Sequence, residues 1–471
     1  MCSPSLRHGE SDNKCNLGRA VADSEVDRMG MSLGQHEHGM AELEEEQRST
    51  RKSRYRYYAL CLLVVVFIVN FIDRSILGIL NQPIKEALSI SDSAMGFLGG
   101  FAFAVFYTFM GIPIARLADT GVRRNIIAVC LTLWSAMTAF SGLAQNYTQL
   151  LLARIGVAVG EAGGSPPAHS MISDFFPPHQ RATALAVYAL GIPIGAMIGH
   201  LAGGWLNEAF NWRIAFFVVG VPGILLAVLV RLTLKEPVRG QWDTEKVSTT
   251  PPPLMAVLKK LWQKRSFRYM TVAGALNAFV GYGAGFWVAP LFYRSHGIGT
   301  QAMGEALFLL GFAGIAGTFL GGYLSDRYGQ RNKSMYLWLP AGVALISVPF
   351  AAFSYLWPNS TTALWVYALP YGLMNFYLGP VFALTQTLSG VRGRALGASI
   401  LLFVLNIVGM GLGPQFVGTA SDLFAGQLQL GSESLRWAMV TALAFNILSV
   451  VFYLLAASYL RTDLSNNSTE S

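Results

Sequence analysis

Three polar side chains interrupt an otherwise apolar stretch at residues 62–80, LLVVVFIVNFIDRSILGIL. They are Asn70, Asp73 and Arg74, and on a helix they fall within one arc of about 100°. A charge at bilayer depth costs on the order of a few kcal/mol, so such a residue is functional by default. The stripe therefore predicts that the polar side of this helix faces a partner helix or a cavity. Arg74 is either a substrate contact or gate, or a side chain that reaches to the membrane surface.

A second apolar segment supplies partner charges for this stripe. Arg154 and Glu161 are seven residues apart, so they lie on one helix face about 10 Å apart along the axis. Gly156 and Gly160 fall on the opposite face, where small residues let helix backbones pack closely. Because the two segments run in opposite directions, we expect Asp73 and Arg154 to meet at similar depth, with Glu161 nearer the midplane.

This spacing predicts a site that handles protons and an anion. Asp73 and Glu161 are the candidate proton carriers, and Arg154 is the candidate ligand for an anionic head group because its guanidinium binds carboxylate or phosphate bidentately. Asn70 is a further candidate substrate contact. The alternative is a static ion pair that stabilises the bundle, but a buried pair adds little net stability.

The elements that must position these charges are membrane spans. Of the 471 residues 53% are hydrophobic and only 13% are charged, against roughly 25% in a soluble domain, and many apolar runs reach the ~18 residues of a transmembrane helix. We therefore expect an all-α membrane protein of twelve helices rather than a soluble or nucleic-acid-binding protein. The segments fall near 57–80, 92–117, 125–145, 148–171, 182–208, 212–234, 268–292, 302–324, 334–355, 362–388, 395–420 and 435–460.

The polar stretches divide the chain into five parts: a flexible tail (1–54), a first six-helix half (55–234), a linker (235–266), a second half (267–460) and a short tail (461–471). Basic residues gather in the first tail, the linker and alternate loops. The positive-inside rule then predicts that both termini and the linker are cytoplasmic, in the inner (plasma) membrane if the source is bacterial. We also expect a short helix on the membrane face at KKLWQKR (259–265).

The two halves repeat a decapeptide: ARLADTGVRR starts at residue 115 and GYLSDRYGQR at residue 322. A parallel repeat of two six-helix halves is typical of one transporter architecture, with its site between the halves. The repeat predicts a cytoplasmic gate formed by Asp119, Arg123, Asp326 and Arg327. The second half has no charges that match those of the first. It offers polar and aromatic side chains instead, which either contact the substrate or only pack: Tyr282, Trp287, Tyr371 and Asn375.

These motifs resemble a known family. GYLSDRYGQR is similar to the loop motif between helices 2 and 3 of the major facilitator superfamily, ARLADTGVRR resembles it more loosely, and GIPIGAMIG (191–199) resembles a glycine-rich motif of its proton antiporters. NFIDRS (70–75), RIGVAVGEAGGSPPAHSMISDFFP (154–177) and QRATALAVYALGIPIGAMIG (180–199) resemble the Spinster family of lysolipid and sphingolipid carriers. In that family the positions matching Asp73, Arg154 and Glu161 form the proton and substrate site.

The resemblance implies a proton-coupled secondary transporter of amphipathic anionic or zwitterionic lipids, of the lysophospholipid or sphingosine-phosphate type. Alternatives are a proton antiporter for drugs or organic anions and a lipid scramblase. We expect no enzyme activity, since the sequence has no Walker loop, no metal cluster and no Ser/His/Asp arrangement. We expect no cofactor besides protons as the coupling ion, no nucleic acid partner and a monomer in the membrane. The exact substrate and the choice between symport and antiport stay open.

Overall fold

The structure is a computed structural model that describes residues 54–242, 254–390 and 393–468. The chain divides into two units, Met1–Ala59 and Leu60–Ser471, and the second unit contains every feature discussed below. The described residues form helices, turns and loops without a strand, so the predicted all-α fold is confirmed. Of the predicted N-terminal tail, residues 1–53 lie outside the described residues.

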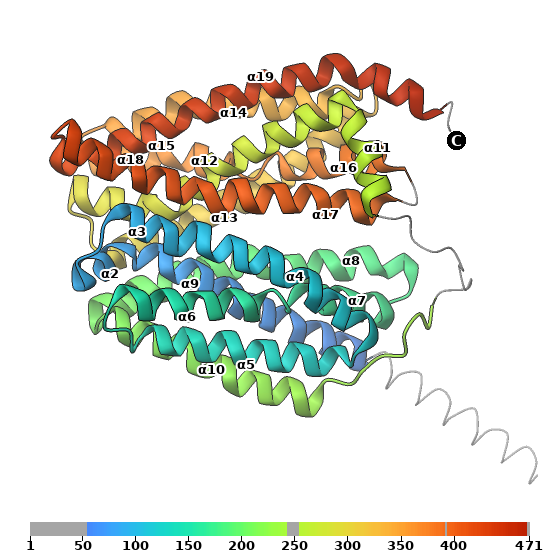
Figure 1. Ribbon diagram of the computed structural model, residues 1–471, viewed down its shortest axis with the longest axis horizontal. Coiled ribbons are helices and arrows are strands. Elements are labelled where there is room, and N and C mark those ends of the chain that lie inside the picture. The colour runs from blue at the N-terminus through green and yellow to red at the C-terminus, as the bar shows by residue number, and fades with distance from the viewer. Residues whose placement is uncertain (1–53, 243–253, 391–392, 469–471) are drawn as a thin grey trace, which may run out of the picture. The chain divides into compact units, whose positions relative to one another are not determined.

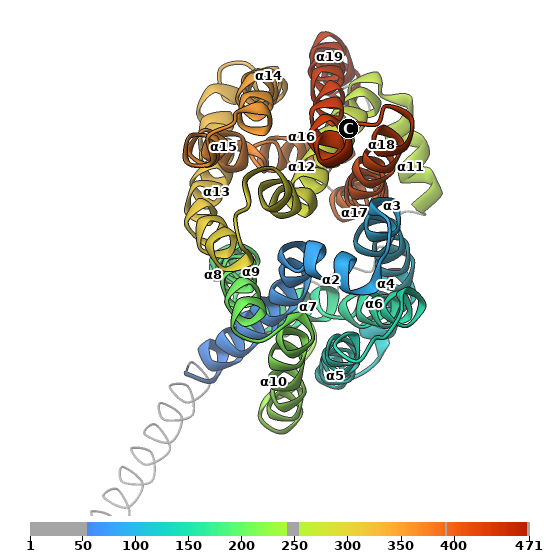
Figure 2. The same ribbon diagram turned by 90° about the vertical axis from the view of Figure 1, so that its left-hand side faces the viewer.

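The helices up to α10 form the first half, which is drawn in blue and green in Figures 1 and 2. They are the first helix Arg54–Ile79, α2 (Asn81–Leu88), α3 (Asp92–Gly96), the π-helix η1 (Phe97–Ala102), α4 (Phe103–Thr120), α5 (Arg123–Ser141), α6 (Tyr147–Glu161), α7 (Ser165–Phe175), α8 (Pro178–Ala189), α9 (Gly191–Ala209) and α10 (Trp212–Thr233).

The second half follows in yellow to red. It comprises α11 (Leu254–Gln263), α12 (Arg265–His296), α13 (Thr300–Gly329), α14 (Met335–Leu356), α15 (Ser360–Leu373), α16 (Leu378–Ser389), α17 (Arg394–Val404), the π-helix η3 (Leu405–Leu412), α18 (Gly413–Gln427), the 3₁₀-helix η4 (Gly431–Glu433) and α19 (Ser434–Ser468). α11 lies at one end of the spans and α2 and α3 at the other (Figure 1).

Each of the twelve predicted segments is helical. Within the described residues, nine helices are long and apolar enough to cross a membrane. The other three predicted segments differ for local reasons. α5 opens with Arg123 and Arg124, which lower its mean hydropathy, and the pairs α6–α7 and α15–α16 are each divided by a short turn. α19 also continues to Ser468, past the predicted boundary at residue 460.

The predicted packing face of α6 is confirmed. A Cβ added at Gly156 would lie 2.6 Å from the Met137 side chain, and one at Gly160 would lie 2.7 Å from the backbone nitrogen of Trp134. Both neighbours belong to α5. Because this face of α6 is held against α5, its opposite face turns Arg154 and Glu161 inward, where both are buried.

The two halves touch closely at the α2–α3 end. A Cβ at Gly96 would lie 2.6 Å from the carbonyl oxygen of Pro414, and one at Gly418 would collide with the carbonyl oxygen of Asp92. α9 packs against α13 in the same way, with Gly204 against the backbone of Thr300. The π-helices η1 and η3 also face one another across the halves. Glycine therefore permits backbone-to-backbone contact at this end.

Candidate functional site

The predicted charged residues lie together in the interior of the first half. Asp73, Arg154 and Glu161 are each at most 2% exposed. Arg154 and Glu161 are the charged groups that act electrostatically on Asp73. Asn70 is also buried and lies beside Glu161. The first helix and α6 thus bring together the four residues that the helical spacing selected.

The pairing inside this cluster differs from the expected one. Glu161 Oε2 accepts a hydrogen bond of 2.6 Å from Nε of Arg74, so Arg74 is the residue that forms the ion pair. Neither carboxylate oxygen of Asp73 has a hydrogen-bond partner among the described residues, and Nε and Nη1 of Arg154 have none either. The expected contact between Asp73 and Arg154 is therefore not formed, and Arg154 retains free donors.

An aromatic pair on α4 completes the cluster. The guanidinium carbons of Arg74 and Arg154 lie 5.3 and 5.6 Å from the ring centre of Phe103, and that of Arg74 lies 4.5 Å from the ring of Tyr107. Such contacts fix the position of a cation without neutralising it. The sequence analysis missed both aromatic residues, because their four-residue spacing is ordinary for an apolar helix and was the sole signal.

One of the predicted side chains of the second half reaches this cluster. Tyr282, in the middle of α12, is 44% exposed and interacts electrostatically with Arg74 and Tyr107 of the first half. It therefore points between the halves and not toward lipid. Tyr371 and Asn375, at the junction of α15 and α16, are partly buried.

Trp287 takes the second of the two roles that the sequence left open, since it packs in this structure. Its side chain is fully buried, and the indole N–H donates a hydrogen bond of 2.8 Å to the carbonyl oxygen of Pro414. The residue thus packs α12 against α18. Its sequence position gave no way to distinguish a packed tryptophan from one that lines a site.

The buried charges are distributed unequally between the halves, as the sequence predicted. Among the described residues, the acidic and basic side chains that are buried all belong to the first half: Asp73, Asp92, Arg123, Arg154, Glu161 and Asp174. The second half contributes buried serine, threonine, asparagine and tyrosine side chains but no buried charge within its described part. One wall of the site is charged and the other is polar, aromatic and apolar.

The predicted gate residues do not join the halves in this structure. Arg123 is buried and forms ion pairs with Asp174 at 2.5 Å and Glu236 at 2.7 Å, both in its own part of the chain. Asp326 accepts a hydrogen bond from Tyr336, and Arg327 donates one to Tyr323. Asp119 is exposed. Their role as a gate stays a prediction, which concerns a state in which this end is closed.

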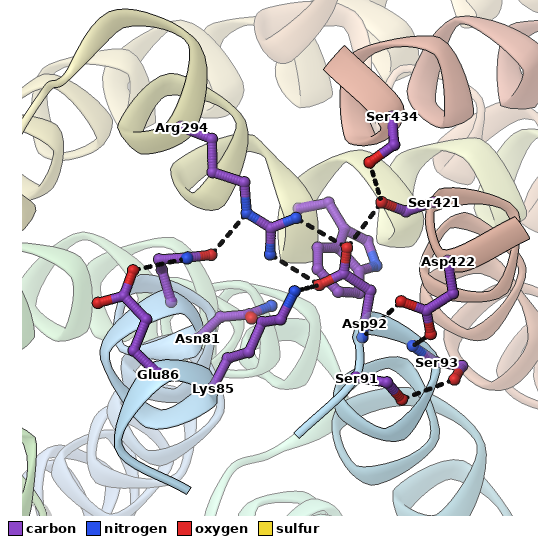
Figure 3. Close-up of polar contacts among 12 residues, drawn as sticks. Asn81, Lys85, Glu86, Ser91, Asp92, Ser93, Arg294, Ser421, Asp422 and Ser434 are labelled. Carbon is purple, nitrogen blue, oxygen red and sulfur yellow. Dashed lines mark hydrogen bonds and ion pairs between the residues drawn. The ribbon is translucent and has the colours of Figure 1, made fainter. Parts of the chain in front are cut away.

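The opposite end holds a polar network that the sequence analysis missed, shown in Figure 3. Arg294 of α12 donates two hydrogen bonds of 2.7 Å to the carboxylate of Asp92, at the start of α3. Lys85 forms an ion pair with the same carboxylate at 2.5 Å, and the hydroxyl of Ser421 donates to it at 2.6 Å. We call these four residues the Asp92 network.

Two further contacts strengthen the closure around the Asp92 network. The carboxylate of Asp422 accepts hydrogen bonds from the backbone N–H groups of Asp92 and Ser93, at 3.0 and 2.7 Å. Nε of Arg294 donates at 2.7 Å to the side-chain oxygen of Gln82. The sequence showed Lys85 and Arg294 as loop charges, but only the fold brings them to one carboxylate.

Taken together, these contacts define where the central charges are accessible. The α2–α3 end is closed by bidentate ion pairing and backbone contact. The Arg74 side chain is nevertheless 19% exposed, and Tyr282 in the middle of α12 is 44% exposed. Because the α2–α3 end is closed, we infer that solvent reaches the site from the α11 end. No group of metal-ligating side chains occurs within the residues searched, which are the described ones.

Comparisons with known proteins agree with this architecture. The family model described as Major Facilitator Superfamily matches residues 63–414. A solved structure of a bacterial homologue of the human lysosomal transporter Spinster, inward-facing and unoccupied, is similar with a TM-score of 0.80 and 34% identity, over 87% of this chain and 98% of that chain. An MFS-type efflux pump of Mycolicibacterium smegmatis is 31% identical, over 90% of this chain and 98% of its own length. A probable L-galactonate transporter of Escherichia coli is 27% identical, over 68% and 72%.

Proposed function

We propose a substrate for this chain from the family to which it belongs, the Major Facilitator Superfamily. The chain is thus an integral multi-pass membrane transporter rather than an enzyme. We propose that it carries amphipathic anionic or zwitterionic lipids, either in exchange with protons or together with them. The lipids are of the lysophospholipid or sphingosine-phosphate type, and transport proceeds by alternating access. The similarity to the bacterial homologue of Spinster supports this substrate class.

One observation carries the proposal: a buried arginine with free donors lies in a cluster that an exposed aromatic side chain of the other half also reaches. Nε and Nη1 of Arg154 lack partners among the described residues, while Tyr282 of α12 is 44% exposed and interacts electrostatically with Arg74 of the same cluster. A guanidinium with free N–H groups suits a phosphate or carboxylate. A wall of aromatic and apolar side chains suits the hydrocarbon part of the same molecule.

Proton coupling follows from the two carboxyl groups. Asp73 is fully buried without a hydrogen-bond partner, and Glu161 is paired with Arg74 through only one of its oxygens. A buried carboxylate that lacks compensation is costly unless it takes up a proton or meets a cation. Proton binding at this cluster and anion binding at Arg154 therefore alter the same set of charges, which is the basis of coupling that we propose.

The accessible end corresponds to the cytoplasmic side in this proposal. α11, which contains Lys259 and Lys260 of the basic linker, lies at the end of the spans opposite α2 and α3 (Figure 1), and the positive-inside rule assigns basic connecting segments to the cytoplasm. The structure would then represent an inward-open state, and the Asp92 network would close the external side. We propose that both termini are cytoplasmic.

A second candidate function is proton-coupled transport of drugs or small organic anions. The similarity to an efflux pump and to a probable L-galactonate transporter favours it. The two candidates differ in what they require of the aromatic wall: a lipid tail needs the apolar surface around Tyr282, whereas a sugar acid needs hydrogen-bond partners there.

The test is uptake by the purified protein in liposomes. We expect accumulation of a fluorescent or radiolabelled lysophospholipid that depends on an imposed pH gradient. Glu161→Gln should retain substrate binding and lose the response to the gradient, while Glu305→Gln, an exposed glutamate of α13, should behave like the parent. Uptake of labelled galactonate but not of lysolipid would favour the second candidate. Lipid movement that is independent of the gradient in all variants would identify a scramblase and contradict the proposal.

A further inference from the structure

A basic pocket lies outside the central site, at the α11 end of the second half. It has a volume of about 510 Å³ and is formed by the loop between α13 and α14 together with the last turns of α19. Arg331 and Lys333 come from the loop, and Arg461 comes from α19. Since these elements are about 130 residues apart in sequence, the fold itself gathers the three cations around one space.

The three cations are available to an external ligand. Among the described residues, the side chains of Arg331, Lys333 and Arg461 form no ion pair or hydrogen bond, and the side chain of Lys333 lies 5.7 Å from the ring centre of Tyr336. No acidic residue lines the pocket. The nearby Asp463 is directed elsewhere, since its carboxylate accepts a hydrogen bond of 2.8 Å from the backbone of Ser266.

The repeated decapeptide gives an internal comparison. Its last residue is Arg124 in the first half and Arg331 in the second. Glu236 accepts a hydrogen bond from the backbone of Arg124 and forms an ion pair with Arg123, and the guanidinium of Arg124 donates to the carbonyl of Leu234. In the first half the protein thus supplies its own anion to this motif. In the second half the counterpart of Arg123 is Gln330, and no acidic residue lines the pocket that contains Arg331.

The position of the pocket indicates the source of the anion. Three candidate membrane spans have an end at the pocket. Thr300–Gly329 ends just before the lining loop, Met335–Leu356 begins just after it, and the last turns of Gly431–Ser465 form the other side of the lining. The ends of membrane spans lie at the depth of lipid head groups. Asn332 and Ser334 add polar groups to the lining, and Leu460 and Leu464 add apolar surface.

We propose that this pocket binds the phosphate head group of an anionic membrane lipid, which then links the α13–α14 loop to α19. The cations neutralise the phosphate, the polar groups hydrogen-bond to it, and the leucines contact the start of the acyl region. Binding at this pocket is separate from transport, so its test does not depend on the proposed substrate.

The experiment uses the full-length protein in detergent, titrated with phosphatidylglycerol, phosphatidylcholine or inorganic phosphate, with thermal unfolding as the readout. A ligand at free concentration L that binds the folded state stabilises it by RT ln(1 + L/Kd), so the melting temperature rises with ligand concentration and with affinity. We expect phosphatidylglycerol to stabilise the parent more than the other two additives do. The triple variant Arg331→Gln, Lys333→Gln, Arg461→Gln should show an apparent affinity for phosphatidylglycerol that is weaker by roughly tenfold or more.

The matched control removes three exposed basic residues at the same end of the spans but outside the pocket: Arg231→Gln, Lys259→Gln and Arg394→Gln. This variant has the same net charge as the triple pocket variant and should respond to phosphatidylglycerol like the parent. An equal loss in both variants would overturn the proposal in favour of diffuse charge attraction. An equal response of the parent to inorganic phosphate would overturn it in favour of a site for a soluble anion.

Discussion

At the scale of single residues, the difference between the two arginines of the cluster decides the chemistry. Arg74 is neutralised by Glu161, whereas Arg154 has free donors and lies over the ring of Phe103. An anion that enters the site therefore finds one guanidinium already paired and one unpaired. We therefore propose that Arg154 binds the head group and that Arg74 holds Glu161.

Substitution by lysine separates these two roles. Arg154→Lys should weaken substrate binding by about tenfold to a hundredfold, since a lysine cannot replace a bidentate charged contact. Arg74→Lys should lose less, because the observed ion pair with Glu161 uses a single N–H group that lysine can supply. The measurement is substrate affinity by equilibrium binding, with Arg213→Lys, outside the cluster, as control. Equal losses at Arg74 and Arg154 would show that fork geometry is irrelevant.

Asp73 competes with the substrate for Arg154 in our interpretation. Asp73→Asn mimics the protonated carboxyl, so this variant should bind the anion at least as tightly as the parent and should lose the pH dependence of binding. It should also be less heat-stable until substrate is added, since Arg154 then has as its nearby counter-charge only Glu161, which is already paired with Arg74. Affinity and melting temperature at two pH values check this. Weaker binding than in the parent at every pH would mean that Asp73 supports the fold or contacts the substrate.

The helical period predicts which side of a helix a residue occupies, but it does not predict which partner the residue contacts. The positions of Asp73, Arg154 and Glu161 follow from spacing along two helices, because a charge in an apolar segment must turn inward. The partner that each charge selects does not follow, since exchanging Arg74 for Arg154 at Glu161 takes only a different rotamer. For Trp287 the sequence left packing and substrate contact open, because residue type alone does not distinguish them, and in this structure the side chain packs.

At the scale of elements, α3 and α18 show how backbone contact closes one end of the protein. A Cβ at Gly418 would collide with the carbonyl oxygen of Asp92, whereas one at Gly426 on the same helix would meet nothing within 4 Å. The contact depends on the register between helices of different halves. Sequence periodicity places apolar helices, but it carries no information on such a register, so neither this contact nor the Asp92 network was predictable.

The added methyl group of Gly418→Ala should therefore push α18 away from the backbone of Asp92. We expect it to shift the population toward states in which the α2–α3 end is open, while Gly426→Ala should be neutral or should stabilise α18 by up to about 1 kcal/mol through helix propensity. A cysteine at Met95, fully buried in α3, reports on the opening through its rate of labelling by a polar thiol reagent. Identical labelling rates in the two alanine variants would show that the close approach at Gly418 does not control this end.

At the scale of the whole molecule, alternating access requires the closed end to open in every cycle. A covalent link across it should stop transport. Cysteines at Ser93 and Asp422, whose backbone and side chain are hydrogen-bonded across the halves, can be joined by a reducible cross-linker after the four native cysteines are replaced by serine. We expect uptake to be lost on cross-linking and restored on reduction.

The control link joins cysteines at Ser91 and Ser93, which contact each other within one half. It should leave uptake unchanged. Transport that persists with the inter-half link in place would mean that the α2–α3 end stays shut during turnover, and the proposed alternating access would then be wrong.

The confinement of buried charge to the first half bears on how such a protein can change through evolution. A mutation in the described part of the second half that spares the Asp92 network meets no other buried ion pair, so it alters the shape of one wall and leaves Asp73 and Glu161 intact. In the mechanism that we propose, new cargo can therefore be acquired by substitutions in one half while the proton-binding groups of the other are inherited unchanged. A transporter with two unequal halves can in this way change its substrate and keep the groups that we propose for coupling.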